Sequence, residues 1–135
     1  METRQRCWGL AALLLLTGCG DDKARAWETL RASNDRWYRM AWGRAMEPAT
    51  VDAEHRRFDC VWDALSRVGR DPREDVACYI RQVDFVVACV RPPASSPSPD
   101  DYRRLTPCAE RSRTVCPLSP DYERAAQTCR GPVPH

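Results

Sequence analysis

The chain has 135 residues, of which 43% are hydrophobic and 30% are charged. A chain of this size is expected to form a single domain with one modest core. Its 21 basic and 19 acidic side chains leave a net charge of +2, so no nucleic acid is expected as a partner. The eight cysteines are the unusual feature of the composition, and their meaning depends on the compartment.

The first residues have the pattern of a targeting segment and not of a folded domain. Arg4 and Arg6 form a short basic start, and an apolar run follows over residues 10–16. Such a run spans about 10 Å as a helix, which is far short of the ~20 residues needed to cross a bilayer. The segment therefore has the proportions of a signal peptide and not of a membrane-spanning helix.

This segment ends in Leu16-Thr17-Gly18-Cys19, which resembles the lipobox of bacterial lipoproteins. The resemblance implies that residues 1–18 are removed, that a lipid is attached to the Cys19 thiol, and that the acyl chains anchor the mature protein to a membrane of the cell envelope. Each buried CH₂ group contributes about 0.8 kcal/mol to such anchoring. In this class an Asp after the modified Cys signals retention in the inner membrane. Because Gly20 stands there, the outer membrane is favoured.

Export makes disulfides the preferred interpretation of the remaining cysteines, since they persist in oxidising compartments. Cys7 leaves with the signal peptide and Cys19 takes the lipid, so six of the eight remain: Cys60, Cys78, Cys89, Cys108, Cys116 and Cys129. A metal site is not expected, because the sequence has no Cys-x-x-Cys and its histidines are His55 and His135. We therefore expect three disulfides, and no cofactor apart from the lipid on Cys19.

A first helix is predicted over residues 22–46, where large apolar residues recur on one face. Glu47-Pro48 is expected to end it, because the residue before a proline is displaced from helical geometry. The helix carries three tryptophans that either pack on the second helix, which we favour, or form a binding stripe for a glycan or an envelope protein: Trp27, Trp37 and Trp42.

A second helix is predicted over residues 51–68, with Thr50 as its N-cap and Gly69 as its stop. His55 lies on the large-residue face of this helix and is expected to be partly buried and structural. A third helix is predicted over residues 72–91, because Asp71-Pro72-Arg73-Glu74 has a capping-box pattern with proline at the first position. The third helix is apolar on two opposite faces, so we expect it to be central.

Residues 92–99 are rich in Pro and Ser and predict an extended linker. Ser98-Pro99-Asp100 and Ser119-Pro120-Asp121 each combine a cap, a first-turn proline and an acid, which predicts two short helices. The predicted fold is therefore all-α: a single small Cys-rich domain over residues 19–135, with three main helices and two short C-terminal helices stapled by disulfides.

Six cysteines allow fifteen pairings. If the second and third helices form an antiparallel hairpin about Gly69, positions equally far from this glycine come level. The first two of the six cysteines lie nine residues on either side of it. The third cysteine, near the far end of the third helix, must then reach the C-terminal third of the chain. The pairs that we favour are Cys60–Cys78, Cys89–Cys129 and Cys108–Cys116.

The sequence gives little sign of catalysis, and we do not expect an enzyme. It has no Gly-rich phosphate loop, no serine-nucleophile motif and no metal motif. The paired acids Asp59 and Asp63 are expected to form a solvated face, and Asp100 and Asp101 a cap. The pattern favours a lipid-anchored protein of the bacterial cell envelope that acts by binding or by structural support. The alternatives are a periplasmic inhibitor or accessory subunit and, in another class, a small envelope hydrolase that uses paired carboxylates.

Overall fold

The computed structural model describes residues 21–90 and 99–130. These residues form five helices and no strand, which confirms the all-α class. The helices are α1 (Asp21–Trp42), α2 (Pro48–Arg67), α3 (Pro72–Val90), α4 (Pro99–Val115) and α5 (Pro120–Thr128). In the two described ranges, none of the helices combines the length and the apolar character needed to cross a bilayer. The signal peptide, Cys19 and residues 92–98 of the linker lie outside the described residues.

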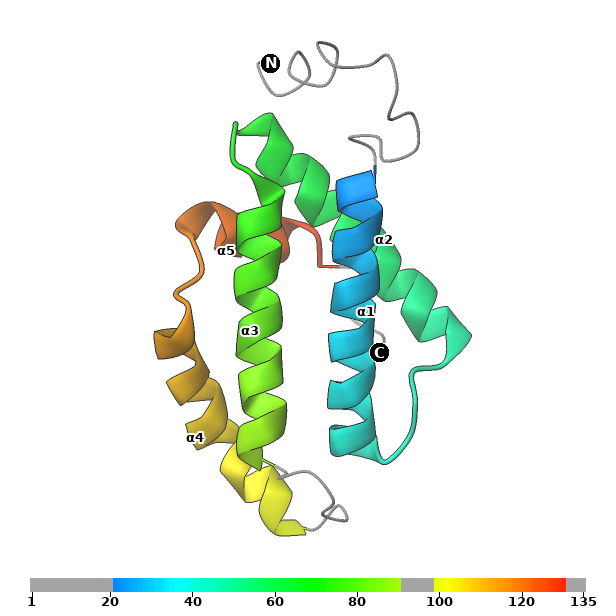
Figure 1. Ribbon diagram of the computed structural model, residues 1–135, viewed down its shortest axis with the longest axis vertical. Coiled ribbons are helices and arrows are strands. Elements are labelled where there is room, and N and C mark those ends of the chain that lie inside the picture. The colour runs from blue at the N-terminus through cyan, green and yellow to red at the C-terminus, as the bar shows by residue number, and fades with distance from the viewer. Residues whose placement is uncertain (1–20, 91–98, 131–135) are drawn as a thin grey trace, which may run out of the picture.

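α3 is the central helix, as its two apolar faces predicted. α1 runs beside it in the same direction, and α4 returns antiparallel along its other side (Figure 1). α2 crosses obliquely behind α1 in this view, and α5 packs against α2 near the α2–α3 turn. The prediction of a level hairpin between α2 and α3 is therefore wrong, because α2 leans away from α3 and packs chiefly on α5.

Two helix starts follow the local chemistry that the sequence indicated. The Asp71 carboxylate caps α3 by accepting the backbone N–H of Arg73 at 3.0 Å. The Ser119 hydroxyl caps α5 by accepting the backbone N–H of Tyr122 at 3.1 Å. Each side chain satisfies a donor that has no partner within its helix, so both predicted caps are confirmed.

Other boundaries differ from the prediction. α1 ends at Trp42, four residues early, because Gly43 takes a positive φ of 69°. α2 starts at Pro48 and not after Thr50. The fixed φ of proline suits the first position of a helix, so Pro48 begins α2. α4 is not short: it has 17 residues and continues through Pro107. α5 is short, with nine residues, as predicted.

The core consists of three small clusters, each at a different helix junction. One joins α1, α3 and α4, a second joins α1, α2 and α3, and a third joins α2 and α5. Their most buried members are Val90, Val76 and Leu65, respectively. A polar link supplements them: the fully buried Ser33 of α1 donates to Asp84 of α3 at 2.6 Å. Because each cluster is small, covalent links between the helices carry much of the architecture.

All six expected cysteines form disulfides, but the three predicted pairings are wrong. The structure replaces Cys60–Cys78, Cys89–Cys129 and Cys108–Cys116 with Cys60–Cys129, Cys78–Cys116 and Cys89–Cys108. The physical reason is the oblique course of α2, which places Cys60 beside the end of α5. The two cysteines of α3 then bond to the cysteine of α4 and to the cysteine that directly follows α4. The bridges are nested, with sequence separations of 69, 38 and 19 residues.

Candidate functional site

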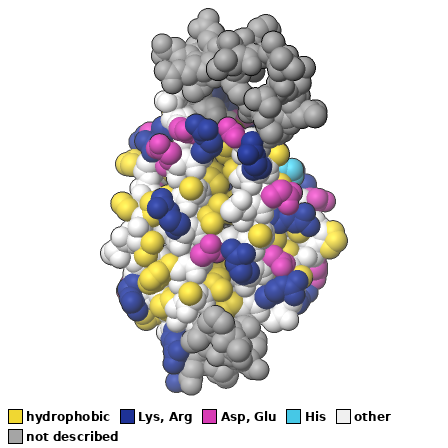
Figure 2. All heavy atoms as spheres, viewed as in Figure 1, with side chains coloured by type: hydrophobic (Ala, Val, Ile, Leu, Met, Phe, Trp, Pro, Cys, Tyr) yellow, Lys and Arg dark blue, Asp and Glu magenta, His cyan; other side chains and the backbone are white. Residues whose placement is uncertain are grey.

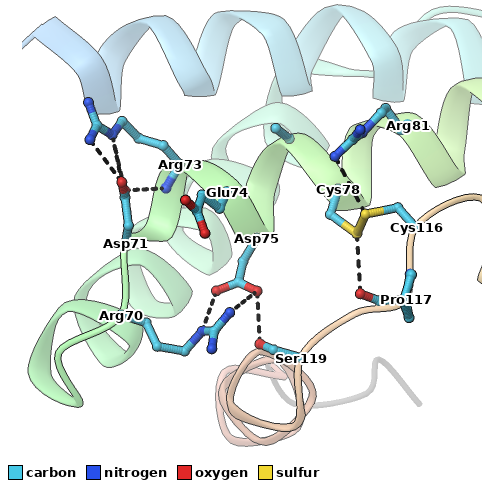
Figure 3. A pocket seen from close by; sticks show the side chains of 11 residues that line it. Arg70, Asp71, Arg73, Glu74, Asp75, Cys78, Arg81, Cys116, Pro117 and Ser119 are labelled. Carbon is cyan, nitrogen blue, oxygen red and sulfur yellow. Dashed lines mark hydrogen bonds and ion pairs between the residues drawn. A yellow bond between two sulfur atoms is a disulfide. The ribbon is translucent and has the colours of Figure 1, made fainter.

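A groove of about 630 Å³ opens beside the first half of α3 (Figure 3). Its walls come from the α2–α3 turn, from α3 and from the segment between α4 and α5. The lining residues are Arg70, Asp71, Arg73, Glu74, Asp75, Ala77, Cys78, Arg81, Cys116, Pro117 and Ser119. The Cys78–Cys116 bridge holds the two walls together, since it joins α3 to the residue that follows α4.

One wall of the groove is a buried ionic network. Asp75 is only 4% exposed, and its carboxylate accepts hydrogen bonds from Arg70 Nε at 2.8 Å and Arg70 Nη2 at 3.2 Å. The Ser119 hydroxyl donates a third hydrogen bond at 2.8 Å. The hydrogen bond with Asp75 raises the pKa of Arg70. A buried carboxylate needs such partners, so this network serves to fix the start of α5 against α3.

A second ionic group fixes the start of α3 against the start of α1. The Arg73 guanidinium lies 2.8 Å from a carboxylate oxygen of Asp71 and 3.2 Å from one of Asp22. Hydrogen bonding to Arg73 lowers the pKa of Asp71, and the same pair raises the pKa of Arg73. These charges are therefore engaged with one another and hold elements in place.

Two charged residues of the groove differ from the rest. Within the described ranges, neither Glu74 nor Arg81 has an ion pair, and Nη2 of Arg81 lies 3.5 Å from the sulfur of Cys116. Both project from α3 two turns apart, about 10 Å along the axis, with the small Ala77 between them. The groove thus presents one carboxylate and one guanidinium to a ligand, and the small side chain of Ala77 leaves space between them. This arrangement suits a polar partner with charges or hydrogen-bonding groups at both ends.

The three tryptophans of α1 do not form one stripe. Trp27 is 6% exposed and packs on Phe58 of α2, as the favoured interpretation predicted. Trp37 is half-buried against the cluster between α1, α3 and α4, so it packs away from α2. Trp42 is 59% exposed at the end of α1. Packing therefore accounts for the first two tryptophans, and Trp42 is the one of the three that is mostly exposed.

Three other residues that the sequence analysis considered lie on α2: His55, Asp59 and Asp63. The His55 side chain is 48% exposed, so the expectation that it is partly buried holds for only one ring face, which stacks on Trp27 with centroids 4.4 Å apart. Asp59 is half-exposed and Asp63 is exposed, and the two share one cation, Lys23, at 3.0 and 3.4 Å. This confirms the predicted solvated face. The side chains of Asp100 and Asp101 lie outside the described part of the chain.

The sequence did not point to the groove, because its two walls are far apart in the chain and meet through Cys78 and Cys116, 38 residues apart. A readable signal was the spacing of Glu74, Ala77 and Arg81, which share one face of α3. On the face shown in Figure 2, basic and acidic side chains are interspersed, which fits the near-neutral charge.

The described residues do not bring together three or more His, Cys, Asp or Glu side chains in an arrangement that could hold a metal ion. Comparison with known protein families, with curated proteins and with solved structures finds no match to the chain.

Proposed function

We propose that the chain is a bacterial lipoprotein, anchored through a lipid on Cys19, that acts at the cell envelope by binding or by structural support. The observation that carries the proposal is Leu16-Thr17-Gly18-Cys19, placed directly after a basic start and an apolar run. The three disulfides support it, because structural disulfides persist in the oxidising compartments outside the cytoplasm. By the same resemblance, Gly20 favours the outer membrane over the inner.

The anchor is tested by mass spectrometry of the purified protein and by fractionation of the cells. The mature chain should begin at Cys19 and carry the added mass of the acyl groups, and it should sediment with membranes. Cys19→Ser should abolish both the added mass and the cleavage. Cys7→Ser is the matched control, because it also removes a leader cysteine, and it should behave like the wild type. An unmodified Cys19, or retention of residues 1–18, would contradict the proposal.

Binding is supported by the groove, since neither Glu74 nor Arg81 forms an ion pair there with another described residue. A polar envelope component, either a glycan or a protein surface, fits this chemistry, and so does the role of an inhibitor or accessory subunit. Pull-down from envelope extract should recover a partner with the wild type and lose it with Arg81→Glu. Arg56→Glu, on the exposed surface of α2, should leave the recovery unchanged. Equal recovery with Arg81→Glu would exclude the groove.

A further inference from the structure

The turn between α2 and α3 leaves an apolar side chain exposed at the end of the molecule. The N–H of Arg70 donates to the carbonyl of Leu65 and that of Gly69 to the carbonyl of Ser66, which is the Schellman pattern of a helix end. Gly69 takes the positive φ of 78° that this pattern needs. The turn therefore satisfies its own backbone groups, and Val68 remains 63% exposed beside it.

In such turns a hydrophobic residue after the glycine commonly packs back on the helix. Here that position holds Arg70, which reaches Asp75 instead. Val68 thus takes no part in the core. Its neighbour Arg67 is exposed as well, and no ion pair or hydrogen bond joins the Arg67 side chain to another described residue.

This turn lies at the same end of the molecule as the start of α1 (Figure 1). The contact between Arg73 and Asp22, 3.2 Å apart, fixes the two starts side by side. Only Gly20 separates Cys19 from Asp21, the first residue of α1. Two residues of chain span at most about 7 Å, so a lipid on Cys19 would hold this end of the domain at the headgroups of the bilayer.

We propose that the α2–α3 turn, with Val68 at its tip and Arg67 beside it, docks on the phospholipid bilayer that holds the lipid of Cys19. This inference rests on the proposed lipid anchor. The apolar tip enters the interface between headgroups and acyl chains, and the Arg67 guanidinium meets lipid phosphates. The short tether keeps the tip at high effective concentration beside the bilayer, so a small contact is sufficient. The domain would then stand with the start of α1 toward the membrane and Trp42 away from it.

Two tryptophan variants test the docking: Val68→Trp and, as a matched control, Val115→Trp at the end of α4, where the native valine is 45% exposed. Each protein is purified with its lipid and placed in vesicles of phosphatidylethanolamine and phosphatidylglycerol, with or without brominated acyl chains, which quench tryptophan on contact. Acylation of Cys19 is first verified by mass, and the helical circular dichroism of both variants is compared with that of the wild type.

The emission added by Val68→Trp should lose more than half of its intensity in the brominated vesicles, whereas that added by Val115→Trp should be unchanged. Adding Arg67→Glu to the Val68→Trp protein should reduce the quenching, since the tip then carries a charge of the wrong sign for an anionic surface. Quenching of Val68→Trp no greater than that of Val115→Trp would overturn the docking and leave the anchor standing. An unacylated Cys19 would overturn both.

Discussion

Ser119 is the residue whose removal tests the wall of the groove most directly, because one hydroxyl performs two tasks. It accepts the N–H of Tyr122 at 3.1 Å as the cap of α5, and it donates to the buried carboxylate of Asp75 at 2.8 Å. Loss of a cap costs about 1 kcal/mol. Loss of a hydrogen bond to a charged group costs about 1.5–3 kcal/mol. Ser119→Ala should therefore lower the free energy of unfolding by about 2.5–4 kcal/mol.

The measurement is guanidinium unfolding of the oxidised protein, followed by circular dichroism. Thr114→Ala is the matched control, because the Thr114 hydroxyl is exposed and bonds only within its own helix, so the change should stay within about 0.5 kcal/mol. In an Asp75→Asn background, Ser119→Ala should cost distinctly less than in the wild type, since the acceptor is then neutral. A cost below about 1 kcal/mol, or the same cost in both backgrounds, would refute the two-task account.

Two further expectations concern aromatic residues. Trp27→Ala should destabilise the protein by about 3–5 kcal/mol, because it empties a core site. Trp42→Ala should change stability by less than about 0.5 kcal/mol and should remove most of the fluorescence that iodide quenches. Similar stability costs for the two variants would contradict the packing. Burial raises the pKa of Tyr122 above the ordinary 10.0, so the unfolded phenol ionises first, and stability should be full below pH 10.0 and fall as the pH rises further. Tyr122→Phe should reduce this fall in unfolding curves taken on both sides of that pH, and an unchanged fall would place the alkaline sensitivity elsewhere.

The features that could be predicted from the sequence are those that depend on interactions between residues close together in the chain. The caps at Asp71 and Ser119 depend on a side chain reaching a backbone N–H two or three positions away, so they could be predicted without knowledge of the fold. The central place of α3 could be predicted for a related reason, since a helix that is apolar on two faces must be covered on both. The length of α4 could not be predicted in this way, because a proline usually ends or kinks a helix. Pro107 nevertheless lies inside α4, which packs along α3.

The disulfide pairing could not be predicted, because it depends on the angle between α2 and α3. Counting outward from Gly69 places two cysteines level only if the helices lie antiparallel along their length. Instead, α2 crosses α3 obliquely and packs on α5, through contacts such as those of Leu65 and Ala125. The groove was missed for the same reason, since one wall joins α3 only after the Cys78–Cys116 bridge is placed.

The nesting of the bridges has a consequence for the order in which the chain is oxidised. Among the six bridged cysteines, counted from Cys60, the first is joined to the sixth, the second to the fifth and the third to the fourth. An oxidant that joins cysteines in the order in which they emerge would first make Cys60–Cys78, which the native fold does not contain. The native set closes most easily from the inside outward, starting with Cys89–Cys108, because the shortest loop loses the least entropy. If the chain is oxidised in that order, the native set forms only through thiol–disulfide exchange that undoes the Cys60–Cys78 bridge, and we then expect a disulfide isomerase to raise the yield.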